Sequence, residues 1–490
     1  MRSRLPKSAW LLALAAVTLG GCKKEQVGPV VVSVVGTPKE LAEPFKTPLT
    51  PASKLIMEAT AQGLVAFNES GEIVPALAQR WIVEDEGRSY IFRLRRTRWP
   101  DGGRVNATQV ADLLKERIRA NLALDPLGDL DIVEAVLPMT GEVIEIRLAA
   151  ARPYFLQLLA QPQMGLLRRD GGSGPYRSHK RPAALFLRPI GDPMAPQDGS
   201  IEIPSWQNRV LRAERGAKAI VRFRMGLSQL VLGGRFTDLP ILARSGIDKS
   251  AVRVDPVQGL FGLALVGDNP MLQSGAVREA LSMAIEREKL PAAFALGGWG
   301  ITDRLVPQQL DLAGEPSYPR WHGLPIEERR TQASQTIGAW RATNGPLAPL
   351  RIALPPGPGA AILFGLVAGD LRRIGVAATQ VALDDDADLR LIDEVAAYDS
   401  ATWYLGRVSC ARHIKCDPRA EETLEEAGLA TSADERIAKL SEADAMMTAY
   451  AGYIPLGMPV RWSLVTPLLN GFGPSPRARH PLNHLFRATN

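Results

Sequence analysis

The stretch Leu94–Leu114, LRRTRWPDGGRVNATQVADLL, decides how the N-terminal half of this chain is predicted to fold. Its run PDGG (100–103) is a turn sequence, because proline fixes φ and glycine allows a positive φ. Asn106 can accept hydrogen bonds from the free amides of a helix start, and Gln109, three residues later, completes a capping-box pattern. We therefore interpret the stretch as a rigid corner between a strand and a helix, not as an active site.

Apolar periodicity on both sides of the turn supports this interpretation. Before the turn, Tyr90, Phe92 and Leu94 alternate with polar residues, which is typical of a half-buried strand. After the turn, apolar residues recur at helical spacing: Val110, Leu113, Leu114, Ile118 and Leu122. Each element has one apolar face, so we expect the corner to pack against a core.

Two further segments predict α/β structure in the C-terminal half. The segment LRIALPPGPGAAILFGLVAGDLRRIGVAATQVAL (350–383) has the pattern strand, helix, strand, which suits a parallel sheet. The segment AVREALSMAIEREKL (276–290) is predicted to be one amphipathic helix. In that helix Val277 and Leu281 should face inward, and Arg278 and Arg287 should face solvent.

The first 27 residues predict export and lipidation. MRSRLPKSAW is a basic region, and LLALAAVTL is an apolar run too short to span a bilayer, so residues 1–21 are interpreted as a signal peptide. LGGC (19–22) resembles the bacterial lipobox, which implies cleavage before Cys22, acylation of that cysteine and a lipidated tether at 22–27. An ordinary signal peptide followed by a chance cysteine is the alternative. No later segment has 18 uninterrupted apolar residues.

Composition and motif content limit the classes of protein to which this chain can belong. A chain of 490 residues, 46% hydrophobic and 22% charged, is typical of a soluble globular protein with two or three lobes. The net charge of +6 falls to +3 without Arg2, Arg4 and Lys7, which gives no argument for a nucleic-acid partner. The zinc-protease, nucleophile-elbow and dinucleotide-binding motifs are all missing from the sequence. We therefore predict no enzyme activity, no catalytic residue, no metal and no cofactor.

The last two cysteines lie close together in SCARHIKCDP (409–418). In an exported protein such a pair is first interpreted as a disulfide, here between Cys410 and Cys416. Because His413 lies midway between them, a metal site with three soft ligands is an alternative, although no fourth ligand is evident. Two free thiols are the third possibility.

Eight motifs follow one another in order along the chain. They are QGLVAFNESGEIVPALAQRW, YIFRLR with RWPDGGRVNATQV, GGSGPY, LVLGGRFTDL, VREALSMAIEREKL, LRRIGVAATQV, YIPLGMPV and LLNGF. Together they resemble family 5 of the solute-binding proteins of ABC transporters, which includes dipeptide-, oligopeptide- and nickel-binding proteins. A lipobox in front is common in that family.

The resemblance implies a two-lobed α/β fold of the type II periplasmic-binding-protein class, with an extra subdomain and a hinge between the lobes. Lobe I would comprise residues 28–60, 165–255 and 465–490, the extra subdomain 61–164, and lobe II 256–464. A peptide or similar small solute would bind between the lobes, and closure would present both lobes to a membrane permease. We expect a monomer in the periplasm, anchored by its lipid to the cell membrane or the outer membrane.

The ligand site is where the family pattern weakens. In peptide-binding members, a segment of the form YD.a..gW..DY supplies an acidic residue that pairs with the ligand's α-amino group. Aligned from Tyr398, this chain has Trp403 and Tyr404 near the aromatic position and no acid near Arg407. Arg407 would suit a carboxylate or phosphate, or it is a surface residue. Asp399 would then have a structural role.

The first strand supplies the other predicted contacts. In VVSVVGTPKE (31–40), Ser33, Gly36 and Thr37 are expected near the cleft, where backbone groups could bind an extended peptide.

The lost acidic residue also permits a second hypothesis, in which the fold serves as an envelope sensor or interaction protein without transport. The altered motifs GGSGPY, with Ser173 for threonine, and AIER, with Glu286 for aspartate, are compatible with it.

Overall fold

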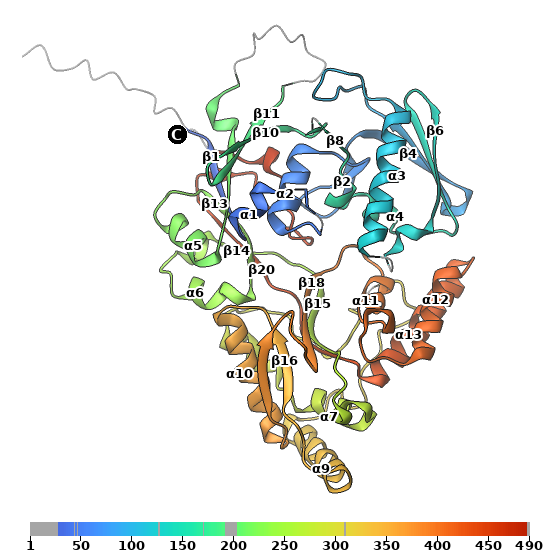
Figure 1. The fold of residues 1–490 in the computed structure, drawn as a ribbon, viewed down its shortest axis with the longest axis vertical. Coiled ribbons are helices and arrows are strands. Elements are labelled where there is room, and N and C mark those ends of the chain that lie inside the picture. The colour runs from blue at the N-terminus through green and yellow to red at the C-terminus, as the bar shows by residue number, and fades with distance from the viewer. Residues whose placement is uncertain are drawn as a thin grey trace, which may run out of the picture.

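The computed structural model describes residues 28–487 apart from 44, 47, 126–127, 170, 192–202 and 308–309. Figure 1 shows two lobes, one above the other, with a subdomain beside the upper lobe. The predicted signal peptide, the tether and Cys22 lie outside the described residues. Within the described part of the chain, no helix has the length and apolar character that a membrane span requires.

The first lobe is built on a seven-stranded sheet in the order β10-β11-β12-β1-β13-β20-β14. Its central strand β1 (Val30–Val35) is a valine-rich, mostly buried run that pairs in parallel with β12 and β13. The other strands are β10 (Tyr176–Arg181), β11 (Ala184–Pro189), β12 (Arg209–Glu214), β13 (Leu230–Arg235), β14 (Val252–Val254) and β20 (Arg461–Val465). The helices of this lobe are α1 (Pro38–Ala42), α2 (Pro51–Thr60), α5 (Gly216–Arg224) and α6 (Leu239–Ala243). The short pair β21 (Leu469–Asn470) and β22 (Phe486–Arg487) follows near the C-terminus.

The second lobe is built on a five-stranded sheet in the order β17-β16-β18-β15-β19. Its strands are β15 (Gly259–Leu265), β16 (Leu350–Leu354), β17 (Ala378–Ala382), β18 (Leu389–Val395) and β19 (Tyr453–Gly457). Its helices are α7 (Gly275–Ala284), α8 (Leu290–Ala293), α9 (Ile326–Asn344), α10 (Pro358–Arg373), α11 (Ala401–Arg407), α12 (Pro418–Leu429) and α13 (Ala433–Tyr450). β16, α10 and β17 form the predicted strand-helix-strand unit, and the two strands pair in parallel. That prediction is confirmed.

The predicted helix 276–290 is shorter than expected. α7 ends at Ala284, and Ile285 is extended, with φ −79° and ψ 126°. Arg278 and Arg287 are buried, so their predicted exposure is wrong. Each guanidinium donates to several backbone carbonyls, including Tyr450 O for Arg278 and Pro455 O for Arg287. Guanidinium groups have enough N–H donors to satisfy the carbonyls at the ends of helices and strands. These hydrogen bonds outweigh the preference of arginine for solvent.

The subdomain contains an antiparallel four-stranded sheet in the order β4-β5-β7-β6. Its strands are β4 (Ala78–Glu84), β5 (Ser89–Leu94), β6 (Val133–Thr140) and β7 (Val143–Leu148). The helices are α3 (Ala107–Leu124) and α4 (Phe155–Leu159), and the short pairs are β2 (Val65–Phe67) with β3 (Ile73–Pro75) and β8 (Leu167–Arg168) with β9 (Gly171–Gly172). The predicted face of α3 is confirmed, because Val110, Leu114 and Ile118 are buried in one core with Phe92.

The corner at residues 94–114 forms as predicted, with one difference. Asn106 caps α3 by accepting from Gln109 N at 3.0 Å. The Gln109 side chain does not complete the capping box; instead its Oε1 accepts from Trp99 Nε1 at 2.9 Å. Trp99 is thus only 2% exposed and is bonded to the first turn of α3. Gly102 has a φ of 83°, the left-handed conformation that the turn requires.

The GGSGPY segment brings two backbones together. Gly174 N donates to Thr60 O at 3.1 Å, at the C-terminus of α2. A Cβ at Gly174 would lie 2.4 Å from Thr60 C, so only glycine fits this contact between α2 and the start of β10.

A buried carboxylate joins the two large sheets. Asp393 on β18 lies 2.7 Å from Arg235 on β13 and 2.7 Å from Arg461 on β20. Both arginines also donate to the Asp393 backbone oxygen at 3.0 Å. Burial alone would raise the pKa of Asp393, but Arg461 and Arg235 hold it below its ordinary value. We call these three residues the Asp393 clasp.

The clasp lies where the chain crosses between the lobes. The crossings run from β14 to β15 and from β19 to β20. Because β20 belongs to the first sheet, the predicted lobe boundary at residue 464 falls inside this strand.

The corner generates a stability prediction. Gly102→Val should lower the free energy of unfolding by about 1–2 kcal/mol, because a side chain in the left-handed region strains the backbone. Gly141→Val is the matched control, since Gly141 also has open space around it but no positive φ. Chemical denaturation of both variants measures the difference. Equal stability of the two variants would contradict the assigned role of Gly102.

The clasp generates a pH-dependent prediction. Asp393→Asn should lower the free energy of unfolding at pH 7 by about 3 kcal/mol, because two arginines lose their charged partner. The pKa of Asp393 is lowered on folding, so its stabilisation is complete above the unfolded pKa near 4 and is lost as pH falls through the folded pKa. The difference between wild type and variant should therefore shrink below about pH 4.

Urea denaturation across pH tests this. Glu142→Gln is the control, because Glu142 pairs with Arg96 on the surface and should contribute less than about 1 kcal/mol. A pH-independent difference for Asp393→Asn would show that the charge of Asp393 is not what stabilises the clasp.

Candidate ligand cleft

A cavity of about 670 Å³ lies between the subdomain and the second lobe. Its walls come from the end of α3, the turn Asp129–Ile132 and the segment after α4 on one side, and from α11 and α12 on the other. The volume is in the range usual for small-molecule sites. Aliphatic side chains such as Leu130, Ile132 and Leu424 line it together with polar and aromatic ones, which include Asp125, Asp129, Arg152, Gln161, Tyr398, Trp403, Arg407, Arg412 and Glu421.

The predicted residues of α11 meet this cavity in different ways. Trp403 and Arg407 line it. Tyr404 is buried behind them and packs edge-on against Trp403, with ring centroids 4.9 Å apart. Burial raises the pKa of Tyr404, so its hydroxyl stays neutral. Of the three, the structure places only Trp403 and Arg407 where a solute in this cavity would touch them.

Arg407 is already paired. Its guanidinium forms an ion pair with Glu394 at the end of β18 and lies 3.5 Å from Asp125 Oδ2 of the subdomain. Asp125 also accepts from Arg412 at 2.8 Å. Arg407 is thus a cleft residue, and it links the second lobe to the subdomain.

The three predicted residues of the first strand lie elsewhere. Ser33 is fully buried and donates to Glu214 Oε1 at 2.8 Å, inside the first sheet. Thr37 is exposed, and its backbone N–H donates to Glu40 Oε1 at 2.8 Å at the start of α1. Gly36 lies between them, and its Cα faces the Glu40 carboxylate. None of the three lines the cavity, because local capping and core bonds use their polar groups.

The structure aligns the family pattern YD.a..gW..DY with residues earlier in the chain than those predicted. The buried aspartate at the start of the strand is Asp388, which accepts from Arg351 N at 2.8 Å. Alignment from Asp388 ends the pattern at Tyr398, so the tryptophan position becomes Glu394 and the acidic position becomes Ala397. The predicted alignment began at Tyr398, and it was wrong because it placed the pattern after β18 instead of along it. The acid remains absent in the new register.

Ala397 and Asp399 instead contact other parts of the chain. The Ala397 carbonyl accepts from Gln161 Nε2 at 2.6 Å. Asp399 does not lie in a strand. Its carboxylate pairs with Arg477, and its N–H donates to Gln157 Oε1 at 2.8 Å. These bonds hold the second lobe against the subdomain and the C-terminal segment.

Four charged residues of α2 and the C-terminal segment, none of which lines the cavity, were not predicted. Lys54 and Glu58 are the only charged residues of α2 and lie one turn apart, while Arg477 and Arg479 alternate in the C-terminal segment. Arg479 Nε lies 3.7 Å from Glu58 Oε1. Burial lowers the pKa of Arg479 to about 10, against the charge of Glu58. The isolated charge pair in an otherwise apolar helix was the signal available in the sequence.

One carboxyl at the rim of the cavity titrates near neutral pH. Burial raises the pKa of Asp129 to about 6, against the charge of Arg152. The Tyr154 hydroxyl donates to Asp129 Oδ1 at 3.4 Å, and the Tyr154 ring stacks on Tyr398 with centroids 4.4 Å apart. This stack is a further contact between the subdomain and the second lobe.

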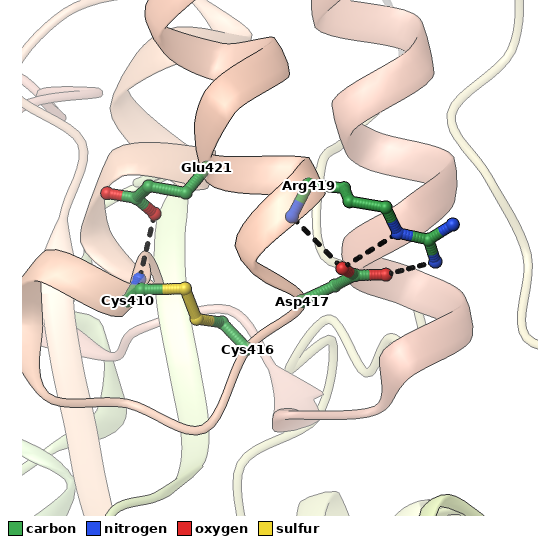
Figure 2. The surroundings of a disulfide bond; sticks show 5 residues. All are labelled: Cys410, Cys416, Asp417, Arg419 and Glu421. Atoms are coloured by element: carbon green, nitrogen blue, oxygen red, sulfur yellow. Dashed lines mark hydrogen bonds and ion pairs between the residues drawn. A yellow bond between two sulfur atoms is a disulfide. The ribbon is translucent and has the colours of Figure 1, made fainter.

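Cys410 and Cys416 form a disulfide in the structure. Figure 2 shows it beside the start of α12, where Glu421 Oε2 accepts from Cys410 N at 2.8 Å. Among the described residues, the possible metal ligands here are the two sulfurs and Glu421, and His413 is not one of them. The disulfide closes the loop between α11 and α12, and both helices line the cavity.

The disulfide generates a prediction. Alkylation without reductant should leave Cys410 and Cys416 unmodified, and reduction should expose both to the reagent. In the loop-entropy account, the bond stabilises the chain by about 2 kcal/mol, because the loop that it closes is short. Mass spectrometry and denaturation of the Cys410→Ser, Cys416→Ser double variant measure these effects. Two thiols that react freely before reduction would rule the disulfide out.

Comparisons with known proteins agree with this architecture. No family model matches the sequence. The chain is 24% identical over 344 residues to the glutathione-binding protein GsiB of Salmonella choleraesuis, a match that covers 65% of this chain and 64% of GsiB. The match thus spans slightly less than two thirds of that relative's length.

Solved structures share the fold over nearly the whole chain. OppA of Burkholderia pseudomallei superposes with a TM-score of 0.77 at 16% identity, over 94% of this chain and 99% of OppA. The murein tripeptide-binding protein MppA of Escherichia coli superposes with a TM-score of 0.76 at 18% identity, over the same 94% and 99%.

A second MppA structure matches less well. Described as unliganded and open, it superposes with a TM-score of only 0.65, over 94% of this chain and 98% of MppA. The ordered motifs, the two-lobed fold and the match to GsiB together show that the chain is related to family 5 of the ABC-transporter solute-binding proteins.

Proposed function

We propose that this protein is the extracytoplasmic solute-binding component of an ABC importer, and that it captures a peptide or similar small solute between its lobes. The cavity of about 670 Å³ between the subdomain and the second lobe carries the proposal. It is large enough for a small solute, and its two walls belong to the second lobe and to the subdomain, which is inserted in the chain of the first lobe.

Short peptides are the first candidate ligands. GsiB is named for glutathione and MppA for the murein tripeptide. The missing acid at Ala397 argues that an α-amino group is not held here as in the family's peptide-binding members. A peptide bound in another way, or a small solute of other chemistry, fits the proposal equally well.

The proposal extends to location and partners. Cleavage before Cys22 and acylation of its thiol would leave the protein in the periplasm, tethered to a membrane by residues 22–27. As a monomer, it would present both closed lobes to a membrane permease. Closure would occur about the crossings on either side of the Asp393 clasp, with lobe I, the extra subdomain and lobe II as assigned from the sequence, except that all of β20 belongs to lobe I.

Blocking the cavity tests the proposal. Gly406 lines the cavity, and a Cβ there would meet no atom within 4 Å, so Gly406→Trp should place an indole in the space with little strain. We expect at least a tenfold loss of solute affinity. Gly365→Trp on the outer face of α10 is the control, because it adds the same ring on open surface and should change nothing.

Calorimetry and thermal shift on ligand-free protein provide the readouts, with panels of glutathione, di- and tripeptides, opines and sugars. Binding that survives Gly406→Trp unchanged would place the solute elsewhere. Failure of wild type to bind any small molecule would contradict the proposed function.

A further inference from the structure

The lining of the cavity between the subdomain and the second lobe carries more negative than positive charge. Its carboxylates are Asp125, Asp129, Asp131, Glu421 and Glu425, and its guanidinium groups are Arg152, Arg407 and Arg412. A charged group that already has a partner in the protein contributes little to the capture of a ligand, whereas an unpaired one attracts the opposite charge. The pairing of each group therefore decides which ligand charge the cavity suits.

Two of the guanidinium groups share their charge with carboxylates of the protein. Arg407 pairs with Glu394 and lies 3.5 Å from Asp125 Oδ2. Arg412 donates to both oxygens of Asp125, at 2.8 and 3.0 Å. Asp125 is thus used inside the protein, and neither arginine is left to attract an anionic ligand.

The third guanidinium group, that of Arg152, joins the two walls of the cavity. It donates to Ala151 O at 3.1 Å and, across the cleft, to Gly428 O near the end of α12 at 2.6 Å. Tyr154, two residues later, donates to Asp129 Oδ1 at 3.4 Å. One short segment of the subdomain thus holds both Asp129 and α12, which line the cavity from opposite walls.

The other carboxylates have no cationic partner. Asp129, Asp131, Glu421 and Glu425 line the cavity, and none of them forms an ion pair with a residue that the structure describes. The first two lie on the turn Asp129–Ile132 of the subdomain, and the last two lie one helical turn apart on α12. Figure 1 shows α11 and α12 of the second lobe below the subdomain. Both walls therefore present negative charge to a ligand.

Asp129 lacks a charge partner most clearly. Its one hydrogen bond within the described part of the chain is the long one from Tyr154. Burial raises the pKa of Asp129 to about 6, and Asp131 adds to this rise, although Arg152, Tyr154 and Arg436 oppose it. A cation bound beside the carboxylate would supply the partner that the protein does not.

The apolar part of the lining indicates an organic cation instead of a metal ion. Leu130, Ile132, Leu424 and Trp403 line the cavity together with the carboxylates. Aliphatic side chains can contact the carbon atoms of a solute, and aromatic rings attract ammonium and guanidinium groups. A calcium ion would gain nothing from these side chains, because it takes about six to eight oxygen ligands.

We propose that the cavity binds the cationic nitrogen group of an organic solute, an ammonium or a guanidinium, with Asp129 as its main contact and Glu425 on the opposite wall. This inference rests on the proposed solute-binding function and specifies its ligand class. Ala397, the acidic position of the family pattern, lines the same cavity, and the next residue, Tyr398, stacks on Tyr154. The negative charge that is missing from the second lobe at this position is thus supplied by the subdomain.

A peptide series that differs only in charge tests the ligand class. Trialanine amide is a cation, N-acetyl-trialanine amide is neutral and N-acetyl-trialanine is an anion, while 1,4-diaminobutane and agmatine supply the cationic groups without a peptide. By calorimetry at pH 7, we expect the cationic peptide to bind about tenfold more tightly than the neutral one. Binding of the amines alone would support the inference and identify a free amine as the source of the cation. Equal binding of the cationic and neutral peptides, or tighter binding of the anion, would overturn the inference while solute binding stands.

Asp129→Asn tests the residue. It should lower the affinity for a cationic probe that wild type binds by about 10- to 100-fold, as expected for loss of a charge-assisted hydrogen bond. Asp112→Asn is the matched control, because Asp112 is exposed on α3 and does not line the cavity. Glu425→Gln should also weaken binding, whereas Glu422→Gln, at an exposed position of the same helix outside the lining, should not. The melting temperature of ligand-free Asp129→Asn should not fall at pH 7, because its carboxylate has no ion pair to lose.

The same carboxylate predicts a pH dependence of binding. A cation needs the ionised form of Asp129, which is present above its pKa of about 6 and is lost as pH falls through that value. The affinity of wild type for the cationic probe should therefore fall about tenfold between pH 7 and pH 5. The affinity of Asp129→Asn should change less over the same range, because the variant has no charge at this position to lose.

Further outcomes separate this inference from the proposed function. Unchanged affinity of Asp129→Asn for a cationic probe that wild type binds would overturn the inference and leave the proposed function intact. Binding of calcium ions in place of every amine would also overturn it, because the carboxylates would then form a metal site. If no probe binds but a molecule is taken up from a cell extract, a cationic nitrogen in that molecule would support the inference, and its absence would overturn it. Failure of every probe, together with no uptake from the extract, would remove the proposed function and this inference with it.

Discussion

The Asp393 carboxylate, shared by Arg235 and Arg461, is the contact on which the arrangement of this protein depends. The three residues come from β18, β13 and β20, so one buried charge fixes the sheet of one lobe against the sheet of the other. A carboxylate held by two guanidinium groups has a defined direction as well as a favourable energy. Because Glu394 is the next residue along β18, the clasp also sets where the walls of the cleft lie relative to each other.

Local sequence signals predicted the parts of the fold that depend on neighbouring residues. The turn and cap between Trp99 and Gln109, and the parallel unit 350–383, depend on φ preferences and apolar periodicity within one segment. The family motifs extended this to the two-lobed arrangement. The burial of Arg278 and Arg287 could not be predicted this way, because their partner carbonyls at Tyr450 and Pro455 lie about 170 residues away.

The ligand site was predicted less well than the fold, for two physical reasons. Tyr398 and Asp399 look like the start of a strand pattern, but the strand precedes them, and only the burial of Asp388 shows the register. The contact between Glu58 and Arg479 joins two segments that are distant in sequence. Trp403 and Arg407 were predicted and do line the cavity, because α11 carries both and forms one wall of it.

The central claim is that the lobes close on a small solute and hold it between them. A solute that contacts both lobes stabilises the closed state by the difference in its affinity for the two states. Native mass spectrometry of ligand-free protein, incubated with the small-molecule fraction of a cell extract, tests this most directly. The account predicts one retained small molecule per chain, and much weaker retention by Gly406→Trp. Retention of no small molecule, or equal retention by the variant, would contradict it.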